Sequence, residues 1–219
     1  LDLLERRIPG QRLAMRRALE QRLKPQRRLH KGATDTHAAL LQLGRSRDGT
    51  LRLVTTNFDR LFDKAAKRTK QTCVGYAAPM LPIPKASRWD GVVYLHGLLP
   101  ARRDDNALHR LVVTSGDFGL AYLTERWAAR FVTELFRNYV VCFIGYSIND
   151  PVLRYMMDAL AADRMLGERT PQAYALGDCE TGEEKNKTTE WTAKGVSPIL
   201  YGRPPGVHDH SALHKTLKA

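Results

Sequence analysis

Short apolar segments that each end in polar residues constrain the fold of this chain more than any other feature of its sequence. The segments at 51–55, 92–95 and 140–144 are rich in branched and aromatic apolar residues, which is typical of strands. Segments with helical periodicity lie between them. Strands that alternate with helices predict an α/β fold with a doubly wound, mostly parallel sheet.

Further elements follow from local signals. Asp35 is expected to cap a helix over 36–43 that stops at Gly44, and proline-rich 71–90 is expected to be irregular. Residues 1–50 are expected to form a small helical portion, 51–205 the α/β domain, and 206–219 a tail or short helix. Further strands are expected at three places, namely 111–114, 173–176 and 196–201.

The most apolar segments carry predictions about burial. Residues 140–144 are expected to form a central strand that is buried on both faces. One long helix is expected to bury a continuous stripe of side chains at i+4 spacing, formed by Leu123, Trp127, Phe131 and Leu135. We interpret this stripe as core packing.

Three polar clusters follow predicted strands. They are Thr55-Thr56-Asn57-Phe58-Asp59, Leu95-His96-Gly97, and Gly145-Tyr146-Ser147 with Asp150 and Pro151 close behind. Parallel sheets bind ligands at the carboxyl ends of their strands, so the clusters are expected to converge on one crevice. Each cluster also has a simpler interpretation, as a helix cap, a structural histidine or a tight turn.

The charge of the chain leaves its partner open. The net charge is +12, and the basic residues concentrate in the first half. Such a bias fits a phosphate-bearing ligand, a nucleic-acid surface formed by the basic helices of 1–31, or a solvated face. Without an aromatic-interleaved basic motif, nucleic-acid binding remains only a rival hypothesis.

Cysteine content and hydropathy indicate a reducing, cytoplasmic setting. The three cysteines are odd in number and widely separated, so no disulfide framework is expected. No apolar stretch approaches the roughly 20 residues of a membrane span, and no signal segment opens the chain. Because the chain starts at Leu1, within what looks like a helix, we expect a fragment or a processed chain.

The three clusters, in this order, resemble motifs of the sirtuin family, specifically the sirtuin-like domains of bacterial antiphage defence proteins. Residues 55–59 look like the Thr-Thr-Asn-aromatic-Asp signature, 95–97 match Leu-His-Gly, and 143–151 match the Gly-aromatic-Ser-x-x-Asp-Pro segment. Residues 36–40 resemble the family's short helix containing histidine. The resemblance covers about 34–205 and implies a Rossmann-like, sirtuin-type fold.

The resemblance also implies an NAD site. Catalytic roles fall to Asn57, which would hold the nicotinamide ribose and a water, and to His96, the general base. Asp59 would help to hold the nicotinamide amide, while Gly145 and Ser147 would line the ribose and phosphate path. The other residues expected at the cofactor site are Thr55, Thr56, Tyr146 and Asp150.

The chemistry agrees with these roles. Cleavage of the nicotinamide–ribose bond builds positive charge on the sugar and needs a positioned water and a base. An ordinary histidine titrates near pH 6.5, and an asparagine amide both donates and accepts hydrogen bonds.

Two departures from the family refine the expectation. The four-cysteine zinc module of sirtuin deacetylases is missing, so no zinc is expected, and NAD hydrolysis is favoured over protein deacylation. The Gly-rich loop that cradles the diphosphate is also missing, so activity is expected to need an upstream segment.

The resemblance suggests an antiphage effector that depletes NAD, acting as a homo-oligomer or with a partner protein. The alternative is a module that binds nucleotides or assembles with a partner without catalysis. A metal site at His208-Asp209-His210 is a weaker candidate, and we favour none there.

Overall fold

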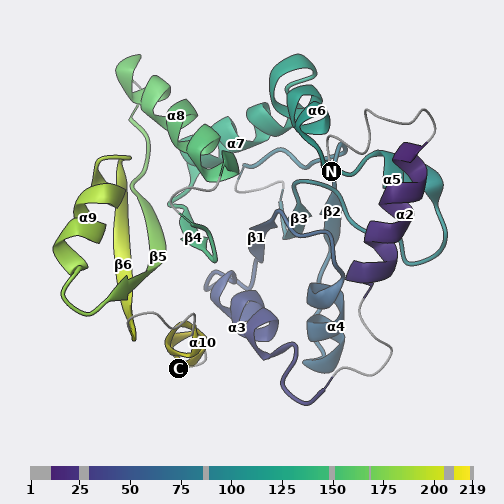
Figure 1. Cartoon of the computed structure of the whole chain (residues 1–219), viewed down its shortest axis with the longest axis horizontal. Coiled ribbons are helices and arrows are strands. Elements are labelled where there is room, and N and C mark those ends of the chain that lie inside the picture. Colours follow the sequence, from purple (N-terminus) through teal and green to yellow (C-terminus); the bar gives the residue numbers. More distant parts are fainter. Residues whose placement is uncertain are drawn as a thin grey trace. The chain divides into compact units, whose positions relative to one another are not determined.

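A computed structural model describes six segments, namely residues 11–24, 30–85, 89–147, 151–167, 169–204 and 210–217 (Figure 1). The chain divides into two compact units. The first comprises Leu1–Ile83 and Ser87–Ala129, and the second comprises Pro84–Ala86 and Arg130–Ala219. Each unit holds one three-stranded sheet whose strands all run parallel. The predicted α/β class with parallel strands is therefore confirmed, and its strands are divided between two sheets.

The sheet of the first unit has the order β1-β3-β2. Strand β1 spans Arg52–Thr55, β2 spans Gly75–Ala77 and β3 spans Gly91–Tyr94. Every residue of the central strand β3 is buried, which explains its uninterrupted apolar sequence. Strand β2 lies within the segment expected to be irregular, so that expectation is wrong. At three residues β2 is too short to show a period, and only its pairing with β3 defines it.

Helices of the first unit pack on this sheet and on the loops that follow it. They are α2 (Gln11–Leu23), α3 (Asp35–Leu43), α4 (Leu61–Arg68), α5 (Asp105–His109), α6 (Ser115–Phe118) and the π-helix η1 (Gly119–Thr124). A core cluster joins α3 and α4 to strand β3 through Leu41, Phe62, Ala65 and Tyr94. The small amphipathic helices therefore bury their apolar faces on the strand that precedes His96.

The C-terminal end of helix α3 was predicted correctly, but the predicted cap at its N-terminus is wrong. It ends at the expected Gly44, but Asp35 belongs to the first turn, and Thr34 precedes the helix without a side-chain cap. The Asp35 carboxylate instead pairs with Arg68 of α4 at 2.6 Å. The Asp35 side chain therefore forms a tertiary ion pair with α4, where a local cap was expected.

The predicted strand at 111–114 is wrong. Leu111 and Val112 are buried, but they lie in a loop, and Thr114 caps α6 through a reciprocal capping box with Asp117. Leu111 packs with Leu99 and Leu108. Here a short apolar run between polar residues indicates burial, but it does not indicate that the segment pairs in a sheet.

The predicted long helix is also divided. The π-helix η1 precedes α7 (Trp127–Asn138), and Arg126 between them has a positive φ of 62°. Leu123 is 63% exposed, whereas Phe131 is 3% exposed. The expected continuous buried stripe is therefore wrong at Leu123, because the change of helix type rotates that residue out of register with α7.

The second unit has a sheet of order β4-β5-β6. Its elements are β4 (Cys142–Ile144), α8 (Pro151–Met165), β5 (Ala173–Glu180), α9 (Glu184–Thr192), β6 (Val196–Arg203) and α10 (Ser211–Thr216). Pro151 opens α8 as predicted, and the two expected late strands are present and longer than expected. The expected boundaries at 50 and 205 remain predictions.

Strand β4 departs from its predicted burial. Cys142 is exposed, and the preceding Val140 is 64% exposed. Among the described residues β4 pairs with β5 alone, so it lies at an edge of its sheet. The expectation of burial on both faces is therefore wrong, because only a strand with two neighbours and two covered faces is enclosed.

A buried arginine anchors α2 to the segment that follows β3. Arg16 is 0% exposed and donates to the carbonyl oxygens of Leu108 and Leu111 at 2.9 and 2.6 Å. It also pairs with the Asp117 carboxylate, which accepts from the backbone N–H groups of Val113 and Thr114. The buried charge is thus paired and hydrogen-bonded, as burial requires.

Replacement of this arginine tests the anchor. Arg16→Met removes the cation that pairs with Asp117 and the donor to the carbonyl oxygens of Leu108 and Leu111, so we expect it to lower the free energy of unfolding by about 3 kcal/mol. Arg17→Met is the matched control, because Arg17 pairs with Asp105 on the surface and should cost much less. Urea denaturation followed by circular dichroism measures both, and equal losses would contradict the anchoring role.

Candidate functional site

Parallel pairing of β1 and β3 places two of the three predicted clusters next to each other. Thr55 pairs in register with Tyr94, so Asn57 and His96 each lie two residues beyond a paired residue. The Leu95 N–H donates to the Thr55 carbonyl at 2.8 Å, and the Leu99 N–H donates to the Phe58 carbonyl at 2.8 Å. The two strand ends therefore continue side by side after the sheet stops.

Local hydrogen bonds shape the turn after β1. The Thr55 hydroxyl oxygen accepts from the Asn57 N–H at 3.1 Å, and the Asp59 carboxylate accepts from the Leu61 N–H at 2.8 Å. Asp59 thus holds the first N–H group of α4 from two residues upstream, while Arg60 at the N-cap position has no side-chain cap. Thr56 is half-buried, whereas the Asn57 side chain is exposed and makes no hydrogen bond within the described residues. Of this cluster, Asn57 is the residue best placed to meet a ligand.

His96 is held inside the protein. It is 6% exposed, and its Nε2 lies 3.0 Å from the hydroxyl of Tyr122, which is 0% exposed. The two rings meet edge to face, with centroids 6.0 Å apart. The Val112 N–H also donates to the His96 carbonyl at 2.9 Å. Sequence reasoning missed Tyr122, because no local signal distinguishes it from an ordinary aromatic core residue.

A second histidine lies close to this turn. His37 of α3 is half-buried, and its ring meets Phe62 edge to face at 5.0 Å. Burial lowers the pKa of His37, and the negative charge of Asp59 opposes this shift. The ring contact with Phe62 places the helix containing His37 against α4, which follows the turn after β1.

The third predicted cluster belongs to the second unit. Gly145 follows β4 with a φ of +76°, a conformation that favours glycine, and Tyr146 meets Phe143 edge to face at 5.8 Å. Ser147 is exposed, and Asp150 lies outside the described residues. Convergence of this cluster with Asn57 and His96 remains a prediction.

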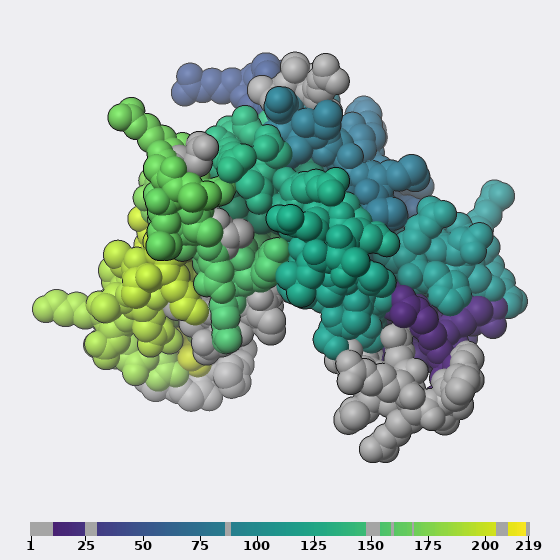
Figure 2. All heavy atoms as spheres, turned by 90° about the horizontal axis from the view of Figure 1, so that it is seen from above, coloured from purple at the N-terminus to yellow at the C-terminus, as the bar shows by residue number. Residues whose placement is uncertain are grey.

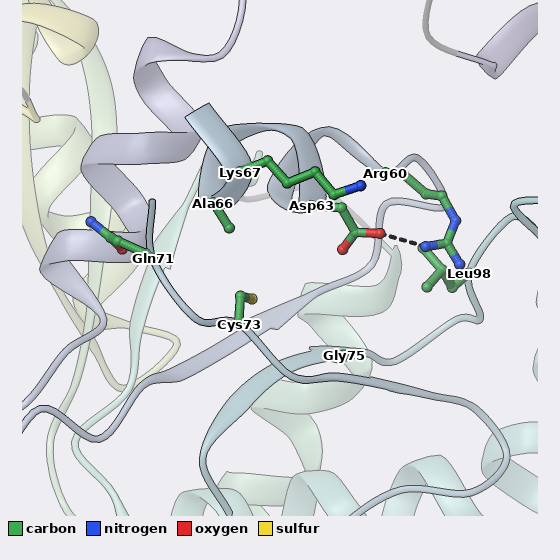
Figure 3. A pocket seen from close by; sticks show the side chains of 8 residues that line it. All are labelled: Arg60, Asp63, Ala66, Lys67, Gln71, Cys73, Gly75 and Leu98. Atoms are coloured by element: carbon green, nitrogen blue, oxygen red, sulfur yellow. Dashed lines mark hydrogen bonds and ion pairs between the residues drawn. The ribbon is translucent and has the colours of Figure 1, made fainter. Parts of the chain in front are cut away.

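A pocket of about 320 Å³ lies between α4 and the start of β2. Its lining comprises Arg60, Asp63, Ala66, Lys67, Gln71, Cys73, Gly75 and Leu98. In Figure 3 the Asp63 carboxylate and the Cys73 side chain both point into this space, and Arg60 pairs with Asp63. Burial, aided by the charge of Asp63, raises the pKa of the Cys73 thiol. Neither Asn57 nor His96 lines this pocket, so it is separate from the predicted site.

Three arginines of α2 form ion pairs within the protein. Arg12 and Arg16 both pair with Asp117, and Arg17 pairs with Asp105 at 2.6 Å. Cations held by carboxylates are less able to neutralise phosphates. These pairs weaken the hypothesis that the basic helices of 1–31 bind nucleic acid.

Neither a candidate metal cluster nor a membrane-spanning helix occurs among the described residues. Among the described residues, no group of three or more His, Cys, Asp or Glu could hold a metal ion. His210 Nδ1 lies 2.8 Å from the Tyr201 hydroxyl, while His208 and Asp209 lie outside the description. All three cysteines are free thiols. Within the part of the chain that the structure describes, no helix is long and apolar enough to cross a membrane.

The fold and the position of the polar residues define the class of protein to which this chain belongs. The chain is a parallel α/β protein with polar residues beyond the carboxyl ends of adjacent strands, where proteins of this architecture bind ligands. A family model described as a SIR2-like domain matches residues 51–199. The chain therefore belongs to the SIR2-like domain family, which relates it to sirtuin-like proteins that use NAD.

A relative supports this assignment. The chain is 33% identical over 192 residues to the protein "Uncharacterized protein y4cA" of Sinorhizobium fredii (strain NBRC 101917 / NGR234). The match covers 84% of this chain and 16% of the relative. The chain thus spans a small part of the length of that relative.

Gly97 offers a test of how the His96 loop is built. Its φ is +97°, and an added Cβ would lie 2.8 Å from Leu111 Cδ2, so Gly97→Ala combines backbone strain with a clash. We expect a loss of about 3 kcal/mol in unfolding free energy. Gly49→Ala is the control, since Gly49 has a φ of +84° but nothing within 4 Å of its Cβ position, and should cost about 1 kcal/mol. Equal losses would show that the contact with Leu111 is unimportant.

The lowered pKa of His37 predicts acid sensitivity. Because the unfolded state binds a proton more readily than the folded state, stability present above about pH 6.5 is lost as the pH falls toward the folded pKa. His37→Phe keeps an aromatic ring against Phe62 and removes this titration. We expect the variant to lose less unfolding free energy than the wild type between pH 7.5 and pH 5.5. Identical losses in urea titrations would contradict the role of His37.

Proposed function

We propose that the intact protein is an NAD glycohydrolase that cleaves NAD to nicotinamide and ADP-ribose, with Asn57 and His96 as its catalytic residues. The observation that carries the proposal is the adjacency of the turn after β1 and the loop after β3, in which hydrogen bonds join Leu95 to Thr55 and Leu99 to Phe58. Membership of the SIR2-like family supports an NAD-related activity at these strand ends.

The two residues suit the two needs of the reaction. The nicotinamide–ribose bond breaks with its electron pair leaving on nicotinamide, and a water oxygen bonds to the ribose carbon and gives up a proton. The exposed Asn57 amide can orient the water or a ribose hydroxyl, because it both donates and accepts. His96, largely shielded from solvent, would take the proton as general base.

The residues described fit NAD in part. In the proposed site Thr55 and Asp59 hold the turn that presents Asn57, and Thr56 lines it. Gly145, Tyr146, Ser147 and Asp150 would line the ribose and phosphate path. The sequence contains no Gly-x-Gly-x-x-Gly, so the diphosphate cradle would come from an upstream part of a longer protein.

The cellular role proposed here is cytoplasmic antiphage defence, in which depletion of NAD halts the infected cell. Its support is the resemblance of the three motifs to defence-associated sirtuin-like domains. Such an effector would work as a homo-oligomer or with a partner protein. Protein deacylation is the weaker alternative, because the sequence has no Cys-x-x-Cys pair for the zinc module of sirtuin deacetylases.

A second candidate is a module that binds a nucleotide or a partner without turning NAD over. The burial of His96 against Tyr122 favours it, because a histidine enclosed by the core and satisfied by a neighbour can be purely structural. Nucleotide binding without release of nicotinamide would distinguish this module from the enzyme.

Nicotinamide release, followed by chromatography, tests the proposal on this chain and on a version extended upstream. We expect turnover in the extended protein, and a loss of about 100-fold or more in Asn57→Ala and in His96→Ala with folding intact. Asn106→Ala and His109→Ala are matched controls, because both residues are exposed on α5. They should retain full activity.

Each outcome decides between the candidates. Turnover in the extended protein alone would show that the diphosphate cradle is essential. Wild-type rates in both Asn57→Ala and His96→Ala would overturn the assigned roles. Nucleotide binding without turnover in any form, with folding verified, would establish the binding module instead.

A further inference from the structure

The segment between α6 and α7 contains an uncommon element next to His96. Residues 119–124 form the π-helix η1, and π-helices occur mostly as short insertions, often at functional sites. In the space-filling view the teal segment around residues 115–130 lies on the face turned toward the reader (Figure 2). Leu120 and Leu123 are exposed, whereas Ala121 and Tyr122 are buried. The π-helix thus directs Tyr122 inward from the surface.

Three contacts hold the start of this segment rigid. The capping box between Thr114 and Asp117 begins α6, and the buried Arg16 pairs with the same Asp117 carboxylate. Phe118 then stacks on the Tyr122 ring, with centroids 4.1 Å apart and an angle of 17° between the rings. The Tyr122 ring is therefore placed by packing and by a buried ion pair, without help from solvent.

The hydroxyl of this ring meets His96 on one defined nitrogen. The distance between Nε2 and the hydroxyl oxygen is 3.0 Å, and both residues are buried. A hydroxyl can donate to an unprotonated ring nitrogen or accept from a protonated one. The 3.0 Å contact fits either arrangement, so the direction of the bond depends on which ring nitrogen carries the proton.

We propose that Tyr122 is a positioning residue for the base, whose hydroxyl oxygen accepts from His96 Nε2–H and leaves Nδ1 to take up the proton. The inference rests on the proposed role of His96 and adds the group through which the fold orients its imidazole. Tyr122 itself is fully buried and is assigned no contact with substrate.

The direction of this bond follows from the protonated state of the base. An imidazolium ring donates from both nitrogens, so its partner at Nε2 must accept. If the Tyr122 hydroxyl already accepts from Nε2–H, it keeps the same orientation when Nδ1 gains a proton. The hydrogen bond then becomes stronger, because the imidazole ring is charged. At 6% exposure His96 has little access to water for the same purpose.

Nuclear magnetic resonance of the 219-residue chain with 15N-labelled histidine tests the bond without any enzymatic readout. The wild type should show a slowly exchanging imidazole proton coupled to Nε2, assigned by its loss in His96→Gln. Tyr122→Phe should abolish or broaden that signal. Tyr94→Phe is the matched control, because Tyr94 is also 0% exposed but its hydroxyl has no hydrogen-bond partner among the described residues.

Kinetics of the upstream-extended protein then tests the positioning role. Tyr122→Phe should lower kcat for nicotinamide release by roughly 10- to 100-fold and leave KM for NAD within about twofold, since the lost hydrogen bond is stronger to the charged ring of the reacting state than to the neutral ring of the free enzyme. Tyr94→Phe should retain wild-type kcat. A rise in KM with unchanged kcat would contradict a role in orienting the base.

The NMR and the kinetic experiments test different parts of the proposal, namely the hydrogen bond and the role of His96 as base. A proton on Nδ1, or an Nε2 signal that persists in Tyr122→Phe, would overturn the inferred bond whatever the protein catalyses. An Nε2 proton that depends on Tyr122, in a protein whose His96→Ala variant keeps full turnover, would instead overturn the role of His96 as base. Loss of the Nε2 signal together with loss of kcat in Tyr122→Phe supports both.

Discussion

Parallel pairing of β1 with β3 is the constraint on which the candidate site depends. In-register pairing of Thr55 with Tyr94 makes both strands end at the same edge, and Asn57 and His96 are the second residues beyond it. Backbone bonds from Leu95 and Leu99 continue the contact past the sheet. A shift of one residue in this register would turn the side chains of one strand to the opposite face and separate the two groups.

A second constraint comes from the Asp117 carboxylate. It accepts from two backbone N–H groups and the Thr114 hydroxyl, and it pairs with the buried Arg16. One buried charge thereby ties α2 to the segment that carries Tyr122. Burial of this pair makes its geometry strict, because Arg16 without Asp117 would be an uncompensated charge in the interior. Arg16 is one of the basic residues of α2 that suggested nucleic-acid binding, and its role here is structural.

Sequence periodicity predicted some elements well and others poorly. The strand at 91–94 was predictable because a strand buried on both faces requires consecutive apolar residues, and the strand at 52–55 because its β-branched and apolar residues end at a polar turn. Strand β2 was not, since three residues carry no measurable period. The run at 111–114 has a strand-like composition, yet it packs in a loop against Leu99 and Leu108. The stripe from Leu123 to Leu135 failed where the π-helix changes the helical phase.

By itself, the sequence determined the α/β class and the two strands that precede Asn57 and His96, because these depend on neighbours in the chain. Only the tertiary structure decided the contact of His96 with Tyr122, which are 26 residues apart, and the pairing of Arg16 with Asp117 across 101 residues. It also decided that Cys142 is exposed. Such outcomes depend on which distant surfaces meet, and local periodicity carries no information about distant partners.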